Sequence, residues 1–125
     1  YNSNPLSLKF AIDNFDSNKN RERKILLLGD MLELGKFSKK LHKKVSKFIN
    51  RSNIDKVYVV GKDIKETFYS LLRSKRGKIL RNKNEIYELI KKKLNNNDHL
   101  MIKGSNSTGL QEIASNIKKG KIYAL

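Results

Sequence analysis

Short, continuous apolar runs alternate along this chain with longer segments in which apolar residues recur every three or four positions. The continuous runs predict strands of a buried sheet, and the periodic segments predict amphipathic helices. Strands are expected at 24–28, 57–60, 78–80, 99–103 and 121–125. Helices are expected at 5–16, 38–50, 63–72, 84–94 and from about 108 onward. This alternation predicts an α/β fold, Rossmann-like and doubly wound, whose mostly parallel sheet carries helices on both faces.

Polar residues at the predicted boundaries indicate where several helices begin. Ser38 is a candidate N-cap for its helix and Asp63 for the next, and Asn84 or Glu85 should open the helix after that. The chain starts at a loop that leads directly into a helix, whereas a doubly wound sheet places a strand before such a loop. We therefore expect the first strand of the sheet to be missing from this fragment.

Residues 28–35 form the most informative segment of the chain. Gly29 ends an apolar run, Asp30 and Glu33 follow three residues apart, and Gly35 closes the segment. Open α/β sheets bind ligands at the carboxyl ends of their strands, where this loop should lie. The two carboxylates could coordinate a cation or accept hydrogen bonds from an ammonium group. The alternative is that Asp30 caps the following turn and Glu33 is solvated.

A second candidate loop spans residues 103–109. It combines Lys103 with small hydroxyl residues and two glycines, so its backbone N–H groups could bind a phosphate or a carboxylate. It is not a P-loop, because Leu110 and Gln111 stand where that motif requires Lys and Ser or Thr. The alternative is a Ser- and Thr-rich helix cap without a ligand.

Further candidates come from the first residues and from the two histidines. Tyr1, Asn2 and Asn4 could hydrogen-bond a base or a ribose, or form only a turn. If the strands are parallel, these residues meet the two loops above at one edge of the sheet. His42 lies beside an apolar residue of its helix, which is more typical of a structural histidine than of a catalyst. No group of ligating side chains near His99 indicates a metal site.

The net charge of +16 raises the question of a nucleic-acid surface. Of the 28 basic residues 22 are lysine and only six are arginine, which reads phosphates and guanines better. The lysines are spread along the chain, and 14 asparagines and 12 isoleucines accompany them, as AT-rich codons would produce. Composition bias is therefore the favoured explanation, and a basic α/β nucleic-acid-binding module is the alternative.

Chain length, cysteine content and the length of the apolar runs bear on domain size and cellular compartment. A chain of 125 residues is most simply one domain, residues 1–125. It has no cysteine, which fits a reducing compartment, and no apolar run approaches the roughly 20 residues that span a membrane. We expect a soluble, cytoplasmic and monomeric protein without a membrane partner.

The three loops resemble motifs of the Mur ligase family, in its branch that adds D-alanyl-D-alanine. Residues 1–5, Tyr-Asn-Ser-Asn-Pro, resemble that branch's Tyr-Asn-Ala-Asn-Pro. Residues 28–35 are identical to its Leu-Gly-Asp-Met-Leu-Glu-Leu-Gly segment. Residues 103–107 are similar to its Lys-Gly-Ser-Arg-Ser loop, with Asn106 in place of arginine. Order and spacing agree over essentially the whole chain.

The resemblance implies the C-terminal, Rossmann-like domain of a three-domain enzyme. Such an enzyme uses ATP and Mg²⁺ to join D-alanyl-D-alanine to UDP-N-acetylmuramoyl-tripeptide, a step of peptidoglycan precursor synthesis. Its C-terminal domain closes over a central ATPase domain, which would bind most of the ATP and the Mg²⁺. The fragment alone should therefore be inactive and contain no catalytic residue. A related ligase such as folylpolyglutamate synthase is a further alternative.

The resemblance also assigns candidate site residues. Nucleotide-binding positions would be Tyr1, Asn2 and Asn4. Substrate-binding or inter-domain positions would be Asp30, Met31, Glu33, His42, Lys103, Gly104, Ser105 and Ser107. The loop that begins at Lys103 would bind the carboxylate of the incoming dipeptide. His42 matches a histidine of the family's motif without an assigned role, and no residue of the fragment is expected to bind a metal.

Overall fold

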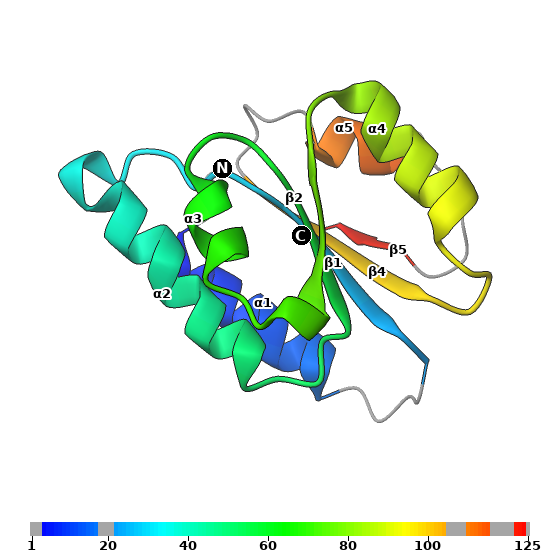
Figure 1. Ribbon diagram of the computed structural model, residues 1–125, viewed down its shortest axis with the longest axis horizontal. Coiled ribbons are helices and arrows are strands. Elements are labelled where there is room, and N and C mark those ends of the chain that lie inside the picture. The colour runs from blue at the N-terminus through cyan, green and yellow to red at the C-terminus, as the bar shows by residue number, and fades with distance from the viewer. Residues whose placement is uncertain (1–3, 18–21, 105–109, 116–121, 125) are drawn as a thin grey trace.

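A computed structural model of the chain describes residues 4–17, 22–104, 110–115 and 122–124, and its centre is a five-stranded parallel sheet (Figure 1). The strand order is β3-β2-β1-β4-β5. The bounds are Lys24–Gly29 for β1, Lys56–Val60 for β2, Arg76–Leu80 for β3, His99–Lys103 for β4 and Ile122–Ala124 for β5. The predicted α/β class and parallel sheet are thereby confirmed.

Helices cover both faces of the sheet (Figure 1). One face carries α1 (Pro5–Asp16), α2 (Ser38–Asn50) and α3 (Ile64–Tyr69), and the other carries α4 (Lys83–Glu88) and α5 (Leu110–Ser115). Short helical turns are η1 (Gly35–Phe37), η2 (Arg73–Lys75) and the π-turn η3 (Leu89–Lys93). Helices on both faces of a parallel sheet make the fold doubly wound, as the alternating sequence pattern predicts.

The central strand β1 divides the core into two apolar clusters. All six of its residues are buried, and their side chains alternate between the two faces of the sheet. Leu26 and Leu28 pack with α1, α2 and α3, whereas Ile25 and Leu27 pack with α4 and α5. Each buried leucine or isoleucine contributes about 1.5–3 kcal/mol, so this strand is a rigid support for the loop that follows it.

The predicted helix starts are confirmed only in part. Ser38 is already inside α2 and makes no capping bond, because its hydroxyl donates to the Asp63 carboxylate 2.8 Å away. Asp63 stands at the N-cap position of α3 but does not cap it with its side chain. The cap of α4 is Asn82, whose Oδ1 accepts from the Glu85 backbone N–H at 3.0 Å, and neither Asn84 nor Glu85.

Within the part of the chain that the structure describes, no helix is long and apolar enough to cross a membrane.

Candidate functional site

The carboxyl ends of the parallel strands bring two of the three predicted loops together. In the strand register Leu28 is paired with Lys103, so the loop after β1 begins beside the end of β4. A Cβ on Gly104 would lie only 3.1 Å from the Gly29 Cα, and the neighbouring loops therefore approach backbone to backbone. Only glycine permits this approach without displacing one of the loops.

The N-terminus of α1 points toward the same edge of the sheet. Its C-terminal residue, Asp16, lies by the opposite edge, because the Lys24 ammonium donates to the Asp16 carbonyl at the start of β1. Asn4 caps the helix: its Oδ1 accepts from the Ser7 N–H at 2.9 Å, and the Asn4 N–H donates to the Ser7 hydroxyl. Tyr1 and Asn2 lie outside the described residues.

Asp30, the first residue after β1, uses both carboxylate oxygens inside the domain. Oδ1 accepts from the Ile64 N–H at 2.8 Å, and Oδ2 accepts from the Lys62 N–H at 3.1 Å. These donors belong to the turn between β2 and α3, so Asp30 caps α3 from a neighbouring strand. Gly61 makes room for this carboxylate, since a Cβ there would lie 2.5 Å from Oδ1. Sequence reasoning missed the role of Gly61, although a glycine that ends a strand is a signal for a close approach.

Met31 anchors the loop in two ways. Its side chain is 1% exposed and belongs to the apolar cluster under α1 and α2. Its backbone N–H donates to the His42 Nε2 at 3.0 Å. His42 is completely buried in α2, beneath the loop, so it supports the loop backbone from inside the domain.

The residues that follow Met31 turn outward. Leu32 and Glu33 are exposed, and Glu33 has a φ of +62°. This left-handed conformation costs a residue with a side chain about 1–2 kcal/mol. Backbone strain of this kind accumulates at functional sites, where surrounding contacts hold it in place. Asp30 and Met31 are thus anchors, and Glu33 is the acidic residue that the loop presents to solvent.

Lys103 ends β4 beside this loop. It is only 6% exposed, and burial lowers the pKa of its ammonium group, because the charged form loses solvation. A lysine in such a position gains most from an anionic ligand, which compensates for the lost solvation. Gly104 is also buried, whereas Ser105 and Ser107 lie outside the described residues.

A hollow of about 300 Å³ opens at the carboxyl ends of β2 and β3, next to the Asp30 anchor. It is lined by Gly61, Lys62, Lys65, Ile79, Leu80 and Arg81. None of these residues is predicted as a site residue from the sequence, because they lie at the ends of strands that carry no recognisable motif. Their three cationic side chains make this part of the edge basic.

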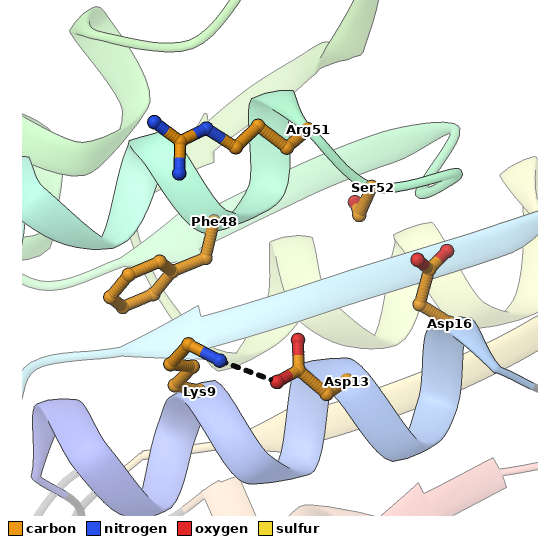
Figure 2. A pocket seen from close by; sticks show the side chains of 6 residues that line it. All are labelled: Lys9, Asp13, Asp16, Phe48, Arg51 and Ser52. Carbon is orange, nitrogen blue, oxygen red and sulfur yellow. Dashed lines mark hydrogen bonds and ion pairs between the residues drawn. The ribbon is translucent and has the colours of Figure 1, made fainter.

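A second hollow lies between α1 and α2, at the other end of the sheet (Figure 2). Lys9 and Asp13 form an ion pair of 2.7 Å within it, and the Lys9 ammonium lies 5.7 Å from the centre of the Phe48 ring. Asp16 accepts from the backbone N–H of Asn53 at 2.7 Å. No predicted site residue lines this hollow, and its carboxylates already have internal partners, which indicates a structural contact between two helices.

The basic residues do not gather on one face of the sheet. Exposed lysines occur along α2 on one face, at Lys39, Lys43 and Lys47, and along η3 on the other, at residues 91–93. A nucleic-acid interface would need a continuous basic stripe on one face. The described residues also contain no group of three or more His, Asp or Glu side chains that could hold a metal ion.

The parallel sheet with helices on both faces defines an α/β domain of the doubly wound class, with a candidate site at the carboxyl ends of β1 and β4. The family model "Mur ligase, glutamate ligase domain" matches residues 1–106. The chain therefore belongs to the Mur ligase family, as the loop motifs predict.

Curated relatives carry a common name. The chain is 31% identical over 120 residues to the UDP-N-acetylmuramoyl-tripeptide--D-alanyl-D-alanine ligase of Bacillus subtilis, covering 94% of this chain and 26% of that protein. It is 34% identical over 121 residues to the ligase of the same name from Buchnera aphidicola, covering 95% and 25% respectively. This chain thus spans about a quarter of the length of the curated relatives it matches.

Solved structures share the fold. The MurF ligase of Thermotoga maritima, determined in complex with ADP, superposes with a TM-score of 0.70 at 20% identity, over 92% of this chain and 26% of that one. MurF of Acinetobacter baumannii superposes with a TM-score of 0.74 at 21% identity, over 93% and 25%. Both comparisons support the doubly wound fold of the present chain.

Proposed function

We propose that this chain is the C-terminal domain of a three-domain, ATP-dependent ligase that adds D-alanyl-D-alanine to UDP-N-acetylmuramoyl-tripeptide. The names of its relatives support this activity. The observation that carries the proposal is the pairing of Leu28 with Lys103, which supports a site formed by the acidic loop after β1 and the lysine that ends β4. Such an edge is suited to closing over a nucleotide-binding domain of the same enzyme.

The two loops would contact different groups at the site. The Lys103 ammonium and the backbone N–H groups after it would bind the carboxylate of the dipeptide, with Gly104, Ser105 and Ser107 shaping the loop. Binding that carboxylate would orient the dipeptide amine for attack on the activated tripeptide. Glu33, which the first loop presents outward, would contact the facing domain or the incoming ammonium group.

ATP and Mg²⁺ would be bound mainly outside this chain. ADP accompanies the Thermotoga maritima relative, which supports a nucleotide for the parent enzyme. Tyr1, Asn2 and Asn4 would lie beside that nucleotide. The Asn4 side chain is occupied by capping α1, so its contribution would come through the helix start that it fixes. We assign Mg²⁺ to the proposed central domain, as the resemblance to the ligase family implies.

Substitution of Lys103 tests this assignment in the full-length parent enzyme. Lys103→Ala should raise the KM for D-alanyl-D-alanine about tenfold or more, because a charge-assisted hydrogen bond contributes about 1.5–3 kcal/mol. The KM for ATP should change much less. Lys62→Ala is the matched control, since it removes an exposed lysine from the same edge and should leave both constants unchanged. Equal effects of Lys103→Ala on both substrates would remove the dipeptide assignment.

A further inference from the structure

The imidazole of His42 connects the candidate loop to two helices. Its Nε2 accepts from the Met31 backbone N–H at 3.0 Å, and its Nδ1 lies 2.8 Å from the Ser38 carbonyl oxygen one turn earlier in α2. The Thr67 hydroxyl of α3 donates to the His42 carbonyl oxygen. One buried residue thus joins α2, α3 and the loop that follows β1.

These partners define a single state of the ring. A backbone N–H can only donate, so Nε2 must offer its lone pair to Met31. A backbone carbonyl can only accept, so Nδ1 must carry the proton that reaches Ser38. The ring is therefore the neutral Nδ1–H tautomer, and each of its nitrogens has a backbone partner.

Two further contacts hold the loop between β1 and η1. Asp30, the residue before Met31, is hydrogen-bonded to the first residue of α3, and the Met31 side chain is held in the core. The bond to His42 fixes the peptide plane on the N-terminal side of Met31, two residues before the left-handed Glu33. Without this acceptor, the Met31 N–H would lose its hydrogen bond to His42 beneath the loop.

We propose that His42 is a positioning residue for the candidate site at the carboxyl ends of β1 and β4. Its Nε2 holds the Met31 backbone and thereby positions the outward-facing Glu33. The effect of this residue on catalysis rests on the proposed function. Its positioning of the loop rests on the hydrogen bonds alone. His42 touches no reacting atom, because it is completely buried below the loop.

Two substitutions separate the nitrogens of the ring. In His42→Gln the side-chain amide reaches the position of Nε2 and can still accept from Met31. In His42→Asn the shorter amide reaches only the position of Nδ1, so the Met31 bond is lost while the Ser38 bond can persist. Val45→Ala is the control, since Val45 is buried in the same helix and belongs to the core, so its loss lowers stability without removing a bond to the loop.

The two readouts are hydrogen exchange of residues 29–35 and the steady-state constants, both in the full-length parent protein. We expect His42→Asn to accelerate exchange of the loop about tenfold and to lower kcat about tenfold, because one buried donor loses its acceptor. The KM for ATP should change less than about twofold. His42→Gln should restore both exchange and kcat toward the wild-type values, and Val45→Ala should change neither beyond its general loss of stability.

The proposal would be overturned by loop exchange in His42→Asn that stays within about twofold of wild type or equals that of Val45→Ala. It would also be overturned if His42→Gln lost kcat as fully as His42→Asn. If His42→Asn does not fold, His42→Phe removes the same acceptor while filling the space, and the same criteria apply. If the wild-type parent shows no ligase activity, the proposed function fails, and the exchange comparison alone still decides whether His42 positions the loop.

Discussion

Gly61→Ala is expected to damage the candidate site through Asp30. Gly61 has a φ of +134°, a conformation that residues with side chains rarely adopt. A methyl group at this position would lie 2.5 Å from the Asp30 Oδ1 and 2.7 Å from its Cγ. The carboxylate would have to rotate away and release the N–H groups of Lys62 and Ile64, which it now holds at 3.1 and 2.8 Å.

Two contributions add up in this variant. The strained backbone costs about 1–3 kcal/mol. Loss of the side-chain cap on α3 costs a further 0.5–2 kcal/mol, roughly the effect of a helix N-cap. The free energy of unfolding should therefore fall by about 2–4 kcal/mol. Asp30→Ala should cost about 1–2 kcal/mol by itself, because it removes the cap and leaves the glycine unstrained.

Urea unfolding followed by circular dichroism measures these differences, and a double-mutant cycle isolates their common part. Once Asp30 is alanine, the methyl group at position 61 has no carboxylate to displace. The double variant should be more stable than the sum of the single effects by about 1 kcal/mol or more. Effects that add within about 0.5 kcal/mol, or a Gly61→Ala cost below that value, would refute the contact between Gly61 and Asp30 as the cause.

Two further predictions concern an acidic residue at each end of the sheet. The Arg23 guanidinium donates two hydrogen bonds to the Asp98 carboxylate, with nitrogen–oxygen distances of 3.0 and 2.6 Å. These bonds lower the pKa of Asp98 below its usual 3.8. Because the folded-state pKa is depressed, this stabilisation is present above pH 3.8 and is lost as the pH falls through the depressed value. Acid titration of stability should therefore show a smaller drop below pH 3.8 in Asp98→Asn than in the wild type, and equal drops would contradict this. Glu33→Gly should raise the free energy of unfolding by up to about 1 kcal/mol, because relief of the left-handed strain exceeds the added freedom of the unfolded chain, and should lower ligase kcat in the parent enzyme. A loss of stability on urea unfolding would show that Glu33 is not strained.

Much of the fold follows from local pattern. The continuous apolar runs predict β1, β2 and β4 to within one residue, and the periodic segment at 38–50 predicts α2 with both of its bounds. The predicted helix at 63–72 is too long, because the observed helix α3 ends at Tyr69 and Leu72 beyond it is 53% exposed. Periodicity counts apolar residues and cannot register where a chain turns away from its own helix axis.

The candidate site is less accessible to such reasoning, because its contacts join residues distant in sequence. Asp30 caps a helix that begins 34 residues later, and Ser38 donates to Asp63 across 25 residues. A capping side chain is normally sought within three residues of a helix start. Local reasoning therefore misses the distant partners of Asp30 and Asp63. The motif at 28–35 predicts a site loop, but it does not show that Asp30 and Met31 anchor the loop while Glu33 faces outward.

The proposed parent enzyme joins D-alanyl-D-alanine to UDP-N-acetylmuramoyl-tripeptide. The most direct measurement of this activity incubates the full-length parent protein with ATP, Mg²⁺ and the UDP-tripeptide, with and without D-alanyl-D-alanine, and follows phosphate release together with the mass of the nucleotide-sugar product. We expect sustained phosphate release and conversion to the UDP-pentapeptide only when the dipeptide is present. Absence of that product, or formation of the amide with an unrelated amino acid in preference to the dipeptide, would contradict it.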